Sequence, residues 1–250
     1  MKEYPRTDGR SYSDARPLSV ELNSLKSTPS CRLTLGGPTP AGAVAERRTS
    51  VLAAVYFSSD NKNRNTVGSY HKPTFEVYVR PPTGPVRGYI RGIECILMKA
   101  LQDFVDQSSL GKLLVSVRIQ ILEEGSGLLA LCLNALVTCV MVAGLKLREI
   151  PHAVQLGVVN RNGAGGVLVD PSPSELSKDC ELGVTMLCTP DTGRISLTSI
   201  DHGRGGYEKR LQGSMESAAR HVAAMRLQQI SDEYQRHFER VRVSFEANIA

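Results

Sequence analysis

The sequence of 250 residues contains no tryptophan, and aromatic residues make up only 5% of it. A folded interior must therefore be built mainly from Leu, Val, Ile, Ala and Met. The six cysteines form no C-x-x-C pair, which argues against a zinc or dithiol motif and fits a reducing compartment. The opening MKEYPRTDGR has no apolar segment, so we expect neither a secretory signal nor a transit peptide.

Motifs for common enzyme chemistry are also missing. There is no G-x-S-x-G nucleophile elbow, and the run Gly163–Gly166 lacks the full G-x-G-x-x-G pattern and leads into a strand, so it predicts a hairpin turn. No histidine occurs at H-x-x-x-H or H-x-E spacing, and the sequence therefore predicts no metal and no cofactor. The net charge of +5 permits an anionic partner but does not require one.

What the sequence does contain is the apolar run Gly127–Gly144. It is barely long enough to span a bilayer, has Asn134 and Thr138 near its centre, and lacks an aromatic belt at either end. A helix buried on nearly all sides of a soluble core is the favoured interpretation, with a membrane span as the alternative.

The remaining periodicity predicts a mixed α+β domain in two loosely similar halves, with no linker between them. A meander of short strands precedes the first helix, Ser58–His71 is a long surface loop, and a long amphipathic helix closes the chain. The expected strands are Leu18–Leu25, Arg32–Gly36, Ser50–Tyr56, Thr74–Arg80, Leu113–Leu122, Val154–Val159, Gly166–Val169, Gly183–Cys188 and Arg194–Ser199; the expected helices are Ile90–Asp106, Gly127–Gly144 and Tyr207–Arg240. We expect residues 1–250 to form one domain.

The turn Gly125-Ser126-Gly127 joins an expected strand to the apolar helix, the position at which helix amides can bind phosphate. Glu123 and Glu124 precede the turn, however, and no Lys or Arg lies within it. We therefore favour a structural role, in which Ser126 caps the helix and the glycines allow close packing.

Three segments together resemble the RNase PH family of phosphorolytic exoribonucleases and RNA exosome ring subunits. They are RTDGRSYSDARPL at Arg6–Leu18, the strand-turn-helix Ile121–Leu147, and GGVLVDPSPSE at Gly165–Glu175. The order and spacing of these segments carry the resemblance, which extends over nearly the whole chain. It implies an RNase PH-like α+β domain with a buried central helix and a long C-terminal helix.

The resemblance also implies which residues an active member would need. Active members have Gly-Thr-Arg or Gly-Ser-Arg at the turn before the central helix, where the arginine holds phosphate, whereas the corresponding run in this chain is Gly125-Ser126-Gly127-Leu128, which has no arginine. They also carry two aspartates at the sixth and twelfth positions after the one corresponding to Asp170, and here these are Leu176 and Leu182. Leucine can neither bind a cation nor transfer a proton. We therefore expect a catalytically inactive subunit.

The expected function is a non-catalytic exosome ring subunit that supports the RNA channel in 3′-to-5′ RNA processing and degradation, including rRNA maturation. The resemblance implies RNase PH-like partners in a hetero-hexameric ring, cap subunits with RNA-binding domains, and RNA, in the nucleus, nucleolus and cytoplasm. Alternatives are an active phosphate-dependent exoribonuclease and a small-molecule enzyme on the same fold. Basic loop residues could line the RNA path or merely be solvated; the candidates are Arg64, Arg87, Arg91, Arg204 and Lys209.

Overall fold

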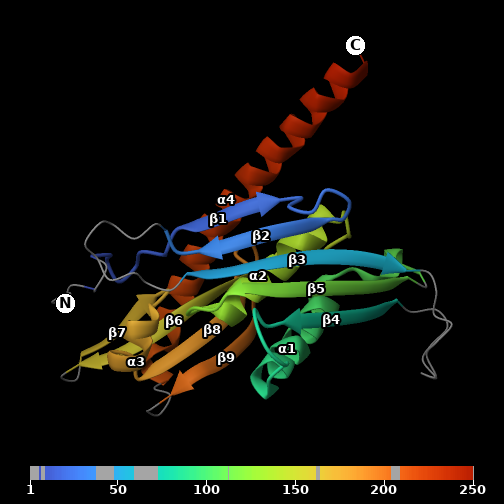
Figure 1. Ribbon diagram of the computed structural model, residues 1–250. Coiled ribbons are helices and arrows are strands. Elements are labelled where there is room, and N and C mark those ends of the chain that lie inside the picture. Colours follow the sequence, from blue (N-terminus) through green and yellow to red (C-terminus); the bar gives the residue numbers. More distant parts are fainter. Residues whose placement is uncertain are drawn as a thin grey trace.

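Two sheets with helices between and beside them make up the computed structural model, which describes residue 6 and residues 9–37, 48–58, 73–111, 113–161, 164–203 and 209–249 (Figure 1). The elements in chain order are β1 (Leu18–Leu22), β2 (Ser30–Leu35), β3 (Thr49–Ser58), β4 (Thr74–Arg80), α1 (Gly88–Phe104), a 3-10 turn η1 (Gln107–Ser109), β5 (Leu114–Glu123), α2 (Leu128–Val142), β6 (His152–Arg161), β7 (Ala164–Val169), α3 (Pro173–Lys178), β8 (Leu182–Cys188), β9 (Ile195–Gly203) and α4 (Lys209–Ile249). The predicted α+β class is confirmed.

The first sheet has five strands in the order β1-β2-β3-β5-β4. β1, β2 and β3 form the predicted antiparallel meander, and β5 pairs antiparallel with β3. The expected continuation of the meander into Thr74–Arg80 is wrong, because β4 pairs parallel with β5 at the sheet edge. The physical reason is α1, which carries the chain across the sheet between two parallel strands, as such connections require.

Alternation along these strands sets the position of the first core. Val51, Ala53 and Val55 on β3 are buried on one face of the sheet, where α1 and α2 pack. α1 contributes Ile90, Ile93, Leu97 and Leu101 at helical spacing, as predicted. The opposite face of β3, β5 and β4 carries polar and aromatic side chains, among them Tyr56, Arg118 and Tyr78.

The second sheet has four antiparallel strands in the order β7-β6-β8-β9. Its apolar residues pack against α4 through Met215, Ala219 and Val222. A hairpin joins β6 to β7, as predicted, with Arg161 paired to Ala164. The predicted turn Gly163–Gly166 lies too late in the sequence, because residues 164–166 belong to β7, and residues 162–163 lie outside the described part of the chain. Residues 59–72, which include most of the predicted long loop, also lie outside it.

α2 lies between the two sheets, and every residue from Leu129 to Val140 is buried. The polar residue Asn134 is satisfied there, since its Nδ2 donates to the carbonyl of Ala153 at 2.9 Å and its Oδ1 accepts from the Ala153 amide at 2.7 Å. The prediction of a buried core helix is confirmed. In the described residues, no helix combines the length and apolar character needed to cross a membrane.

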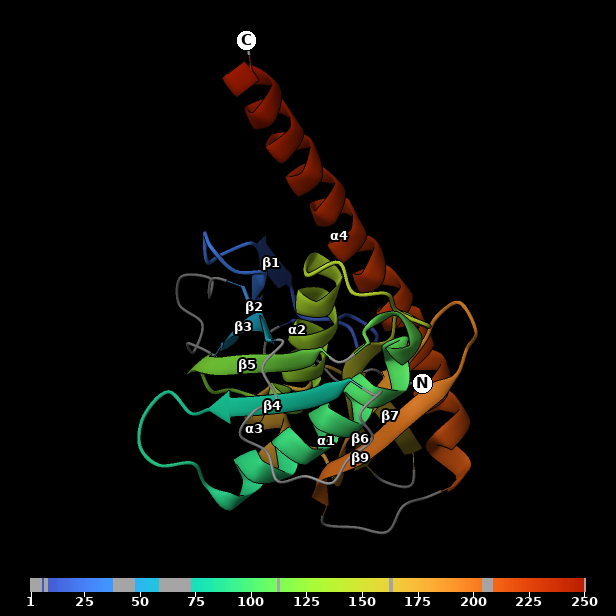
Figure 2. The same ribbon diagram turned by 90° about the vertical axis from the view of Figure 1, so that its right-hand side faces the viewer.

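α4 is the longest element, at 41 residues. Its first half packs on the second sheet, and its second half projects past β1 and away from the body of the protein (Figures 1 and 2). Asn23, in the turn after β1, lies beside this projecting half, with its Nδ2 2.8 Å from Nε2 of His237. Further along, Phe238 is 65% exposed.

Candidate functional site

Surrounding side chains pack tightly against the turn Gly125-Ser126-Gly127, which precedes α2. Gly127, the N-cap residue of α2, has a φ of +77° and makes no side-chain capping bond. A Cβ on Gly127 would meet Oε1 of Gln155 and Cδ2 of Leu35 at 3.3 Å, so only glycine fits without displacement. The prediction that a glycine here permits close packing is confirmed.

The predicted capping role of Ser126 is wrong. Its hydroxyl donates to the carbonyl of Pro171 at 2.6 Å, which ties the turn to the segment after β7. The carbonyl of Ser126 accepts from Thr49 Oγ1 at 2.7 Å and from Arg16 Nη2 at 3.1 Å. Because the side chain is committed to Pro171, it cannot reach the helix amides.

Arg16 brings a cation to the turn, which the local sequence did not predict. Its side chain comes from the segment before β1, 110 residues earlier than Ser126. The residue is only 5% exposed, and its guanidinium contacts the protein backbone. This arrangement fastens the N-terminal segment to the turn and leaves the turn itself covered, so it does not create an open phosphate site.

Asp170 is the centre of the buried charges next to this turn. It is fully buried, has a φ of +44°, and accepts through Oδ2 from the Arg16 amide at 3.2 Å. The same oxygen forms an ion pair with Nη2 of Arg226, a residue of α4 that is 2% exposed. Asp170 thereby joins β7, the N-terminal segment and α4.

A second buried ion pair completes this arrangement. The Arg6 guanidinium contacts Glu175 in two places, Nε to Oε1 at 3.0 Å and Nη2 to Oε2 at 2.9 Å. Glu175 also closes the capping box of α3 with Ser172. The motif residues Arg6, Asp170 and Glu175 therefore meet in space, where they hold the fold together.

The three leucines at the expected catalytic positions belong to three different apolar clusters. Leu128 is partly buried against the core of the first sheet, and Leu182 is 5% exposed within the core under α4. Leu176 on α3 packs against a small cluster of Val159, Leu168 and Cys180. Each leucine contributes apolar packing, and none offers a charge or a proton-transfer group.

Other buried titratable groups lie in the two cores. Within the described ranges, no three His, Cys, Asp or Glu side chains gather as a metal site would need. His152 on β6 is 1% exposed, and burial and the nearby Arg226 lower its pKa well below the usual value, which keeps the ring neutral. Burial also raises the pKa of the Cys132 thiol to about 12, so that thiol is unreactive.

Of the basic residues expected to contact RNA, the structure places two together. Arg87 is the N-cap residue of α1 and Arg91 lies one turn later, and both are exposed. Tyr89 lies between them in sequence and donates its hydroxyl to Oε1 of Glu124 at 2.7 Å, which raises the pKa of Tyr89. Arg64 and Arg204 lie outside the described residues, and Lys209 begins α4, where only its backbone is described.

Several known proteins resemble this chain in sequence or in fold. No protein-family model matches the chain. The Arabidopsis thaliana protein named exosome complex exonuclease RRP46 homolog is 26% identical over 218 residues, covering 80% of this chain and 84% of that protein.

Two solved structures share the fold. A crystal structure of rice (Oryza sativa) Rrp46 superposes with a TM-score of 0.70 at 23% identity, covering 91% of this chain and 97% of that one. A chain of the Archaeoglobus fulgidus exosome with RNA bound to the active site gives a TM-score of 0.70 at 18% identity, covering 90% of this chain and 92% of that one. The resemblance seen in the sequence is confirmed: the chain is an RNase PH-like protein, similar over most of its length to exosome subunits of the Rrp46 type.

Proposed function

We propose that this chain is a non-catalytic ring subunit of the RNA exosome, which supports the channel through which RNA is processed and degraded from its 3′ end. The likeness in sequence and fold to proteins named as Rrp46 supports the choice of complex. Maturation of rRNA is the process that we assign to it. Nucleus, nucleolus and cytoplasm are the compartments in which such a complex would act.

The observation that carries the non-catalytic assignment is the packing of Leu128, Leu176 and Leu182 in apolar clusters. In active members of the family these positions hold an arginine and two aspartates. A small movement of the backbone could not restore the missing chemistry at these positions, because a leucine side chain has no charged atom. Phosphorolysis needs a held phosphate and a group that assists proton transfer, and this chain supplies neither at those positions.

The proposed partners are other RNase PH-like subunits, which would form a hetero-hexameric ring beneath cap subunits with RNA-binding domains. A ring subunit needs two interfaces, each burying roughly 1,200–2,000 Å² of total surface if it resembles other stable contacts. Exposed apolar side chains on separate elements are suited to the centres of such interfaces, among them Tyr89 on α1, Ile200 on β9 and Phe238 on α4. RNA contact through Arg64, Arg87, Arg91, Arg204 and Lys209 remains a prediction.

The test of this proposal is co-expression of the full chain with RNase PH-like exosome subunits from the same source, followed by affinity purification. We expect a stoichiometric complex with at least one such subunit. The chain purified by itself should be prone to aggregation, because its interface surfaces are then exposed.

A stable monomer that binds no RNase PH-like chain would contradict the ring assignment. Phosphate-dependent shortening of RNA by the pure chain would instead favour the alternative, an active 3′-to-5′ exoribonuclease. The two results are distinguishable, since one measures association and the other measures chemistry.

A further inference from the structure

The outer face of the five-stranded sheet carries aromatic and basic side chains. We call the outward-facing residues of β3, β5 and β4 the platform face. The strand register aligns them in rows, which are Tyr56-Ser116-Glu76, Ala54-Arg118-Tyr78 and Leu52-Gln120-Arg80. The first core lies on the opposite side of the same strands. The platform face is therefore a surface that no helix of the described chain covers.

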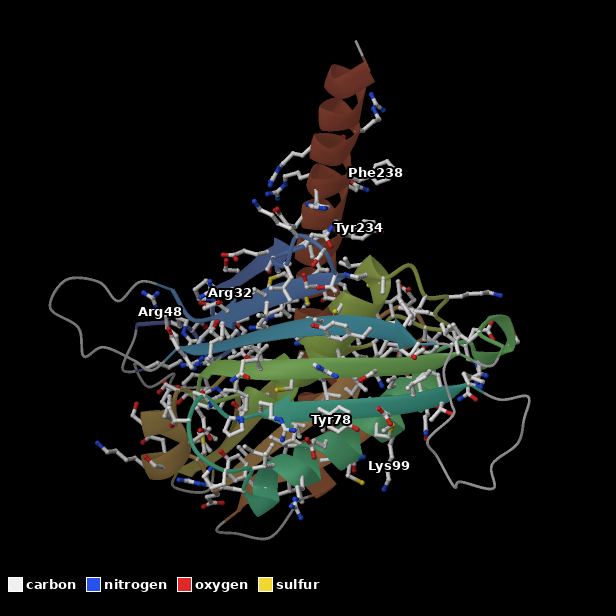
Figure 3. The ribbon with its side chains drawn as sticks, turned by 45° about the vertical axis from the view of Figure 1, so that its right-hand side comes forward. Arg32, Arg48, Tyr78, Lys99, Tyr234 and Phe238 are labelled. Carbon is white, nitrogen blue, oxygen red and sulfur yellow. The ribbon has the colours of Figure 1, made fainter. Side chains whose placement is uncertain are left out.

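Arg118 lies at the centre of this face between two tyrosines. Its Cζ is 4.9 Å from the centre of the Tyr56 ring, a cation–π contact. Tyr78 is its direct partner on the other neighbouring strand and is labelled on β4 in Figure 3. With strands spaced at about 4.8 Å, the two tyrosines stand on strands about 10 Å apart. Arg118 thus contacts the Tyr56 ring and lies on the strand between the two strands that carry Tyr56 and Tyr78.

Small residues form the floor between these larger side chains. Ala54 is 4% exposed and Ser116 is 8% exposed, so neither rises above the strands. The Ser116 hydroxyl has no hydrogen-bond partner among the described residues, although it lies between Tyr56 and Glu76. Its oxygen is covered by neighbouring side chains, so Ser116 contributes to this floor and does not itself contact a ligand.

The platform face offers arginines to a ligand. Arg118 and Arg80 are both exposed, and Arg32 extends the third row on β2. The opposing carboxylates are Glu76, which accepts from the Tyr78 hydroxyl at 3.3 Å, and Glu21, which lies 4.0 Å from Arg32. On β3, β5 and β4 themselves, the arginines are Arg118 and Arg80 and the carboxylates are Glu76 and Glu123, which pairs with Ser50 at the end of the face. A ligand that uses both the arginines and the tyrosine rings must offer negative groups and flat apolar surfaces.

We propose that the platform face binds single-stranded RNA, with bases stacked on Tyr56 and Tyr78 and a phosphate held by Arg118 between them. Aromatic rings on a sheet accept any base through its π-face, and arginine holds the backbone. The choice of RNA as the ligand rests on the proposed function. The face itself lies in one chain, so binding does not depend on ring assembly.

Fluorescence anisotropy of a labelled ten-nucleotide single-stranded RNA, titrated with the full chain, tests the proposal. Tyr56→Leu combined with Tyr78→Leu should weaken binding by about fivefold or more for each lost stack, without changing the salt slope. Arg118→Gln should lower the slope of log affinity against log salt by about 0.7. Replacing both tyrosines by phenylalanine should preserve affinity, because the rings remain.

Two matched controls lie elsewhere on the molecule. Tyr234 on α4 is 38% exposed, close to the 37% of Tyr56, and Figure 3 shows it on the projecting helix. Arg148 is an exposed arginine that follows α2, which packs on the other face of the sheet. Tyr234→Leu and Arg148→Gln should both leave RNA binding unchanged. The chain contains no tryptophan, so quenching of its tyrosine fluorescence by RNA gives a second readout of stacking.

Three results would overturn the proposal. The first is an unchanged RNA affinity in the leucine double variant when its thermal unfolding matches that of the original chain. The second is an equal loss of affinity in the Tyr234→Leu control. The third is unchanged RNA binding with loss of association with an RNase PH-like subunit, which would make the face a subunit interface. In that case the ring assignment would stand while this inference failed.

Discussion

Arginine has opposite environments in two regions of this protein. Beside the turn before α2, Arg6 and Arg226 are buried and each forms an ion pair with a buried carboxylate. On the platform face, Arg118 is exposed and contacts a tyrosine ring. Burial fixes the first set as structural, because an unpaired buried charge is costly, and exposure leaves the second set available to a ligand. Arginine thus stabilises the fold in the first region, and in the second region it is accessible to a ligand.

Breaking the buried ion pair should have the largest effect on stability. Asp170→Asn keeps the size of the side chain and tolerates the φ of +44°, but it leaves Arg226 charged and without its anion. We expect a loss of about 3–5 kcal/mol in the free energy of unfolding, measured by urea denaturation.

The matched control is Asp103→Asn. Asp103 lies 3.3 Å from Arg194 in an exposed ion pair, with both side chains about half exposed. This substitution should cost at most about 1 kcal/mol. Similar losses in the two variants would show that burial is not the deciding factor.

The next effect concerns the glycine that closes the turn. Gly127→Ala imposes a left-handed backbone on alanine and also crowds Gln155 and Leu35. We expect a loss of about 1–3 kcal/mol in the free energy of unfolding. Gly84 has a φ of +79° with nothing within 4 Å of the added Cβ, so Gly84→Ala measures the backbone cost alone. If Gly84→Ala is as destabilising as Gly127→Ala, the turn is not tightly packed.

A smaller effect should appear in the pH dependence of stability. Because burial lowers the pKa of His152, the folded protein keeps the ring neutral while the unfolded chain takes up a proton below about pH 6.5. Stability should therefore fall as the pH decreases below that value, by at most about 1.4 kcal/mol per pH unit.

His152→Leu should remove this contribution to the slope, measured by urea denaturation at several pH values between 5 and 7. The exposed His221 provides the control, and His221→Gln should retain the slope of the original chain. An unchanged slope in His152→Leu would show that other groups dominate the acid response.

Much of the fold could be predicted from local sequence patterns. The alternation of apolar and polar residues over Thr74–Arg80 predicted β4 with its observed bounds. The nearly unbroken apolar run Gly127–Gly144 predicted α2 as a buried helix. The short helix α3 was missed, although Ser172, Pro173 and Glu175 form a readable capping box with proline in the first turn. The parallel pairing of β4 was also missed, because strand order depends on the path of α1 rather than on the strand itself.

The site was less predictable than the fold. Arg16 reaches the turn from a distant segment, and no local spacing indicates that contact. The Ser126 hydroxyl donates to the Pro171 carbonyl and does not cap the helix amides. This contact was also not predictable, because Pro171 is distant in sequence and is brought close to Ser126 only by folding. The platform face could have been suspected from Arg118 and Tyr78 at outward positions of their strands. Their pairing required the register of three strands.

The central claim is that this RNase PH-like chain has no phosphorolytic activity. The most direct test incubates the pure chain, shown to be folded by its ability to bind an RNase PH-like subunit, with 5′-labelled single-stranded RNA in phosphate buffer containing a divalent cation. We predict no shortening of the RNA, and no extension when nucleoside diphosphates replace phosphate, because Leu128, Leu176 and Leu182 supply no charge. Phosphate-dependent shortening that persists in the pure chain would contradict the account.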